Sequence, residues 1–167
     1  MNSLEYKSKL KDSLEAYFDV SLDKELINNK FDIYANFNSR NAKYMLSKKA
    51  EIYAYKSNEY VFYKNINQSI HKGFSREIKE YILNNTNELL QLDKEHMSSI
   101  INVIFTISGG LTEEIIKETK SFKLFKNFNF GFNGWMNTRL IVIDLNTNEI
   151  YTNKFGKKDG KKFLFNN

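Results

Sequence analysis

Two carboxylates, Asp32 and Glu51, are the residues of this sequence best placed to do catalysis. Both fall on strands that we predict to be neighbours in an antiparallel sheet. A carboxylate pair can hold Mg²⁺, and a nearby Lys can stabilise the charge that develops during the reaction. The alternative is that both carboxylates are solvated on the outer face of the sheet. We therefore assign no catalytic residue, and keep Asp32 and Glu51 as candidates for a Mg²⁺-dependent nuclease.

Other residue types that commonly do chemistry are missing or wrongly spaced. The 167 residues include no Cys, which excludes disulfides, Cys-ligated metals and thiol chemistry. His71 is expected in a loop and His96 on a helix surface, and neither has the spacing of a metal ligand. Gly109-Gly110 ends a predicted helix and is no phosphate loop. The sequence predicts neither a metal ion nor a cofactor.

The strongest local pattern lies between Phe122 and Trp135, where five Phe residues occur in eleven positions. The end of the chain is also basic: residues 120–167 carry nine Lys and Arg against three Asp and Glu, whereas residues 1–119 carry 16 against 17. Single-stranded nucleic acid binds by stacking bases on aromatic side chains in a cationic groove, each base contributing about 1–3 kcal/mol. The binding residues that this predicts are Trp135, Arg139, Lys123, Lys126 and Lys154.

The same Phe residues admit a structural interpretation. Phe128, Phe130 and Phe132 alternate with small or polar residues. Such alternation is typical of a strand with one buried face, and buried Phe side chains cannot stack on bases. Trp135 follows Asn133-Gly134, the strongest type I′ hairpin signal in the chain. We therefore expect the three Phe residues in the core and Trp135 beside a turn, where partial exposure is expected.

Hydrophobic periodicity and turn residues predict the elements that must position these side chains. The first part is predicted to contain a helix over 3–18, a connection over 19–29, and antiparallel strands over 31–37, 44–55 and 60–63, with turns at 38–41 and 56–59 and a bulge near 47–49. Helices are expected to follow, with N-caps at Ser75, Asp93 and Thr112. The Phe-rich strand, a doubly covered strand through 140–143 and a strand over 149–155 then make a second meander.

We predict a single α+β domain over residues 1–167, with the helices on one face of the sheet. Its parts are a helix plus first meander over 1–66, helices over 70–121, a second meander over 122–156 and a basic tail over 157–167. There is no apolar signal segment at the start, and the longest apolar run is too short to span a membrane. These features predict a soluble, cytoplasmic protein without membrane contact, and the bias towards residues with AT-rich codons indicates a bacterial or phage source.

Three resemblances bear on function. The predicted element order resembles the restriction-endonuclease-like core, but Glu51 is followed by Ile52-Tyr53 where that family has Glu-x-Lys. The order also resembles that of small secretion-chaperone-like proteins, which bind partner peptides on a sheet or helix face. The segments 44–47, 58–62 and 130–135 resemble a small prokaryotic family with no assigned function, a resemblance that brings no catalytic residues.

Together these observations favour a non-enzymatic interaction module. We expect it to bind a protein partner through an exposed aromatic patch or a sheet edge. The first alternative is nucleic-acid binding through the basic, aromatic end of the chain, and the second is the Mg²⁺-dependent nuclease. The identity of the partner and the oligomeric state stay open at this point.

Overall fold

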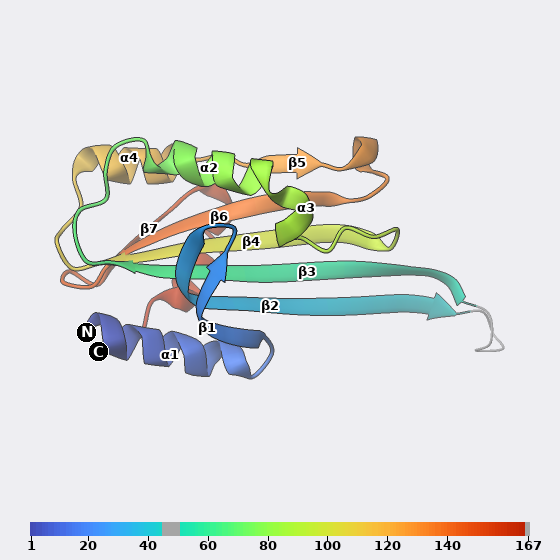
Figure 1. The fold of residues 1–167 in the computed structure, drawn as a ribbon, viewed down its shortest axis with the longest axis horizontal. Coiled ribbons are helices and arrows are strands. Elements are labelled where there is room, and N and C mark those ends of the chain that lie inside the picture. Colours follow the sequence, from blue (N-terminus) through green and yellow to red (C-terminus); the bar gives the residue numbers. More distant parts are fainter. Residues whose placement is uncertain (45–50, 166–167) are drawn as a thin grey trace.

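The computed structural model describes residues 1–44 and 51–165, with the backbone alone described for 41–44 and 51–55. The described residues form a mixed seven-stranded sheet with four α-helices, so the predicted α+β class is confirmed (Figure 1). The elements are α1 (Ser3–Glu15), β1 (Asp19–Leu26), β2 (Asn29–Tyr44), β3 (Glu51–Ile66), α2 (Phe74–Asn84), α3 (Thr86–Leu89), β4 (His96–Ile107), α4 (Glu113–Ser121), β5 (Phe125–Asn127), β6 (Trp135–Asp144) and β7 (Glu149–Thr152), with 3-10 turns η1 (Asn129–Gly131), η2 (Lys154–Gly156) and η3 (Gly160–Phe163).

The sheet mixes parallel and antiparallel pairs. Its strand order is β1-β2-β3-β4-β6-β5, with β7 also paired to β6. β3 and β4 are parallel, as are β4 and β6, while the other pairs are antiparallel. Parallel neighbours need a crossover instead of a tight turn. Since α2 and α3 supply one crossover and α4 lies in the other, the predicted arrangement of two three-stranded antiparallel meanders is wrong, and all the strands belong to one mixed sheet.

The central strand β4 occupies residues predicted to form a helix from Asp93. Met97, Ile100, Ile101 and Ile104 fit a helical stripe, but residues 101–104 are buried on both faces of the sheet while Met97 is exposed. Ile101 packs with one core cluster and Ile104 with the other. An apolar run without polar alternation fits either structure, and its β-branched residues favour the strand.

The first hairpin is longer than predicted, and β1 replaces the expected connection before it. The predicted turns at 38–41 and 56–59 instead pair with each other, with Asn38 opposite Asn58. Asn38, Ser39 and Arg40 are polar, and Asn38 and Arg40 are exposed, so the apolar alternation that marks a strand is missing there. The predicted bulge near 47–49 lies outside the described residues.

Helices cover both faces of the sheet, so the prediction of one covered face is wrong. On one face, α1 packs Tyr6, Leu10 and Leu14 against strand residues such as Val61 and Ile141. On the other, α2, α3 and α4 pack against Phe62 and Leu140. The hydroxyl of Tyr6 donates a 2.8 Å hydrogen bond to the carbonyl of Phe163, so α1 is tied to the end of the chain.

Two helices, α1 and α4, begin where a polar side chain accepts a backbone N–H of the first turn. The hydroxyl of Thr112 accepts the N–H of Ile115, which confirms the predicted start of α4. α1 begins at Ser3 behind a reciprocal Asn2–Glu5 capping box. The predicted cap at Ser75 is wrong, because α2 begins at Phe74 and its N-cap is Gly73, two residues before Ser75 and in the left-handed region.

Asn153 is the polar side chain on which the outer edge of the sheet depends. It is 0% exposed. Its side-chain oxygen accepts the N–H groups of Leu140 and Gly156, and its amide donates to the carbonyls of Phe122 and Thr138. One side chain thus satisfies backbone groups of β6, of η2 and of the residue after α4.

We predict that Asn153→Ala lowers the free energy of unfolding by about 2–4 kcal/mol, because it leaves several buried backbone N–H and C=O groups without a hydrogen-bond partner. The control is Asn127→Ala, which removes an exposed Asn from β5 and should change the free energy by less than about 0.5 kcal/mol. Urea denaturation measures both. Equal losses in the two variants would contradict the role given to Asn153.

Candidate functional site

Residues 128–134, between β5 and β6, form an ordered loop that we call the aromatic loop (Figure 1). The N–H of Phe128 donates to the carbonyl of Gly134 at 2.9 Å, which closes the loop at its base. The carbonyl of Phe128 in turn accepts the N–H groups of Gly131 and Asn133, at 2.9 and 3.2 Å. The backbone of the loop is therefore defined by its own hydrogen bonds.

The tip of the aromatic loop presents two Phe side chains to solvent. Phe130 is 98% exposed and Phe132 is 85% exposed. The prediction that both lie in the core is wrong, because the strand ends at Asn127 and the alternation beyond it does not continue a sheet face. Phe128 is half-buried, with its ring in T-shaped contact with His96, 5.6 Å between centroids.

The loop backbone is strained at its tip. Asn129 and Phe130 both have positive φ, 47° and 54°, and Asn tolerates this left-handed conformation far better than Phe does. The predicted type I′ turn at Asn133-Gly134 is wrong, since only Gly134 of that pair has positive φ. Gly134 is also required sterically, because a Cβ there would collide with the backbone of Met97.

A buried His–Ser pair holds the loop from below. His96 Nδ1 lies 2.6 Å from the carbonyl of Asn133, and Nε2 lies 2.8 Å from the hydroxyl of Ser99. A carbonyl can only accept, so Nδ1 donates to Asn133, and in the neutral imidazole Nε2 then accepts from Ser99. This resembles a nucleophile with its base, but Ser99 is 0% exposed and offers no attacking atom to a substrate. The pair is an anchor, and the expectation that His96 lies on a helix surface is wrong.

Ion pairs fix the start of β4 beside the loop. Arg40 donates two 2.9 Å hydrogen bonds to the carboxylate of Glu95, and Lys56 pairs with Asp93. The Arg40 hydrogen bonds lower the pKa of Glu95 to about 2, so this carboxylate is charged at neutral pH. These contacts hold the residues before His96 against β2 and β3.

A second aromatic group runs beside the loop. Trp135 stacks on Phe125, and Phe125 stacks on Phe155, with centroids 6.0 and 6.5 Å apart and rings within 28° of parallel. Phe125 is 52% exposed and Trp135 is half-buried. Met97, at the base of the aromatic loop, is 49% exposed. Exposed apolar side chains are therefore present at the tip of the aromatic loop, at its base and on the edge strand β5 that leads into it.

The basic residues predicted to bind a ligand fall in different surroundings. Arg139 is buried, and its guanidinium donates to Asp159 at 2.6 Å and to Glu59 at 3.4 Å. Lys126 lies over the ring of Phe128, 5.6 Å from its centroid. Lys123 and Lys154 are exposed. Of the five predicted residues, Trp135 and Lys126 flank the aromatic loop, while Arg139 has its charge occupied internally.

The two candidate catalytic carboxylates do not form a described site. Asp32 accepts the backbone N–H of Asn65 at 2.6 Å, a structural contact between β2 and β3. Glu51 begins β3, but its side chain lies outside the described residues. Within the described part of the chain, no group of three or more His, Asp and Glu could hold a metal ion.

The sheet and the loop define an α+β protein that carries an ordered, exposed aromatic loop. The chain belongs to the family described as "Domain of unknown function (DUF8052)", whose model matches residues 2–165. The resemblance to a family with no assigned function is thereby confirmed. No curated protein and no solved structure matches the chain. Among the helices in the described residues, none has the length and apolar character needed to cross a bilayer.

Two glycines of the loop allow its close packing to be tested. Gly131 and Gly134 both have positive φ, but a Cβ meets nothing within 4 Å at Gly131 and meets the Met97 backbone at Gly134. We predict that Gly131→Ala costs about 1 kcal/mol of stability, from φ alone, and Gly134→Ala about 2–4 kcal/mol. Urea denaturation followed by the fluorescence of Trp135 gives both values. Equal losses would show that the loop base is not closely packed on β4.

Proposed function

We propose that this protein is a non-enzymatic interaction module that docks on a protein partner through the aromatic loop. The observation that carries the proposal concerns Phe130, whose side chain is 98% exposed and whose backbone lies in the left-handed region. Exposure of a large apolar side chain and positive φ at a bulky residue are both unfavourable. Strain of this kind concentrates at ligand clamps and binding sites.

The order of the loop favours binding. A side chain already held in its bound position loses less conformational entropy on association. The loop's own hydrogen bonds and the His96 anchor supply that order. Aromatic residues are also enriched at the buried centres of protein interfaces. Phe130 and Phe132 fit the role of anchors that enter an apolar pocket.

The free energy available from burying Phe130 and Phe132 indicates how extensive the contact must be. Complete burial of two Phe side chains contributes about 3–6 kcal/mol, which does not exceed the cost of bringing two proteins together. The partner must therefore also cover neighbouring apolar surface, and Phe125 and Met97 provide it. The exposed Lys123 favours a partner with acidic residues around its pocket, whose association slows as salt rises.

Nucleic-acid binding is the second candidate, and the stacked row of Trp135, Phe125 and Phe155 is the observation that favours it. Bases could contact the exposed part of the Phe125 side chain, and Lys123 and Lys154 could meet phosphates. The internal pairing of Arg139 removes one of the cations that this function would use. The nuclease is the weakest candidate, because Asp32 is engaged by a backbone N–H.

We predict that the partner meets the aromatic loop and the apolar residues beside it, and does not meet exposed aromatic residues elsewhere on the protein, such as Tyr17. A photo-crosslinking amino acid placed at position 130 or 132 in living cells of the source organism should trap one protein, and the same amino acid at the exposed Tyr17 should not. The purified partner should then lose at least about 100-fold in affinity for Phe130→Ser/Phe132→Ser and less than about twofold for Tyr17→Ser.

The outcomes separate the two candidates. A trapped protein that binds the double Ser variant as well as the unaltered chain would overturn the loop as the docking site. Labelled single- and double-stranded oligonucleotides test the alternative: binding at low salt that falls steeply as salt is added, and that weakens in Lys123→Ala/Lys154→Ala, would favour nucleic acid. No shift at low salt would remove that candidate.

A further inference from the structure

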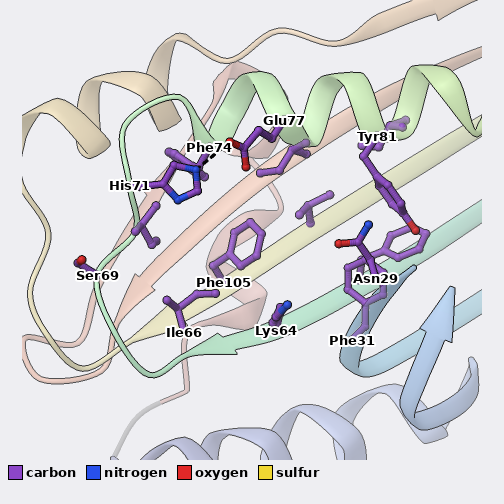
Figure 2. A pocket seen from close by; sticks show the side chains of 15 residues that line it. Asn29, Phe31, Lys64, Ile66, Ser69, His71, Phe74, Glu77, Tyr81 and Phe105 are labelled. Carbon is purple, nitrogen blue, oxygen red and sulfur yellow. Dashed lines mark hydrogen bonds and ion pairs between the residues drawn. The ribbon is translucent and has the colours of Figure 1, made fainter. Parts of the chain in front are cut away.

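A cavity of about 440 Å³ lies between α2 and the sheet, away from the aromatic loop (Figure 2). Its floor is formed by β2, β3 and β4, and its wall by α2 and the chain that leads into it. The walls are mainly aromatic and aliphatic, with Phe31, Phe62, Val103 and Phe105 on the strands and Phe74 and Ile78 on the helix. Its volume falls in the range of small-molecule sites, which are concave and mostly apolar.

The cavity is more than a packing defect. Protein interiors leave few voids larger than a water molecule, and this space is far larger. Phe105 and Ile78 are only half-buried although they face α2 and the sheet, so the space opens to solvent. It lies over the carboxyl-terminal parts of the parallel strands β3 and β4, on the face of the sheet that α2 covers.

One cation stands in this apolar wall. Lys64 follows Phe62 and precedes Ile66 at alternate positions of β3, and all three line the cavity. Its side chain is half-buried, and no hydrogen bond or ion pair joins its ammonium to another described residue. At the mouth, His71 and Glu77 are paired with each other at 2.9 Å (Figure 2), so the Glu77 carboxylate is already engaged.

We propose that this cavity binds a small organic anion with an apolar body, of the fatty-acid type, whose carboxylate pairs with Lys64. The apolar walls would cover the chain, and the ammonium would supply the charge-assisted hydrogen bond that fixes the head group. Charge complementarity selects this class: an uncharged amphiphile leaves Lys64 without a partner, and a cationic one is repelled. This site is independent of the aromatic loop and of the function proposed for it.

Three probes with the same chain test the class of ligand: decanoate, decanol and decyltrimethylammonium. Isothermal titration should give saturable binding of decanoate to one site, about tenfold or more tighter than that of decanol, with the cation weakest. Methyl NMR shifts confined to residues such as Ile78 and Val103 would locate the site. Decanol binding as tightly as decanoate, or no saturable binding of decanoate, would overturn the proposal.

Variants then test Lys64 and the cavity. Lys64→Met should remove the preference for decanoate over decanol while decanol still binds, whereas Lys79→Met, which removes an exposed charge from α2, should change neither. Val103→Phe should exclude all three probes by filling the space, with thermal unfolding as the check on folding. Should that variant not fold, Phe105→Trp fills the cavity from a half-buried position. Unchanged decanoate affinity in Lys64→Met or in the filled variant contradicts the assignment.

Discussion

The fold depends on one constraint, which is that the parallel strands β3, β4 and β6 are buried on both faces. Parallel neighbours cannot be joined by tight turns, so α2, α3 and α4 must cross over the sheet, and here all three lie on the same face. The opposite face then needs its own cover. α1 and η3 provide it, and the bond from Tyr6 to Phe163 joins the beginning of the chain to its end.

Hydrogen bonds and ion pairs of buried polar side chains specify how the parts of this apolar frame fit together. Asn153 satisfies backbone groups on three segments, and Arg139 meets Asp159 and Glu59 across the sheet. A buried charge without a partner is strongly unfavourable, so these pairs select one arrangement over others.

Two features of the structure depart from close packing of apolar side chains. The aromatic loop exposes Phe side chains on a strained backbone, and the cavity leaves apolar walls uncovered beside Lys64. Departures from local rules of this kind are expected at functional sites.

The sequence correctly predicted features that depend on residues close together in the chain. The predictions failed where contacts between distant segments decide the structure. The cap at Thr112 and the buried strand through 140–143 were confirmed, because a hydroxyl at a helix start and a wholly apolar run carry their own signal. β4 was mistaken for a helix, since its apolar residues fit both periods and the partner strands cannot be read from it. The exposure of Phe130 and the cavity depend on segments far apart in the chain, and alternation alone predicted the opposite for Phe130. No local pattern in the sequence indicated that Arg139 pairs with Asp159.

The aromatic loop and the cavity both contact β4, but at opposite ends of the strand. Met97 lies at the base of the aromatic loop, and Phe105 lines the cavity eight residues further along the same strand, a separation of about 26 Å at the rise of an extended chain. Ile101 and Ile104, between them, are fully buried and packed into opposite core clusters. A close-packed core resists small continuous deformation, and coupling between distant sites needs an element with two discrete arrangements. The middle of β4 is held by parallel neighbours on both sides and has no such freedom. Occupation of the cavity should therefore leave the aromatic loop unchanged, and each site can be judged by its own ligand.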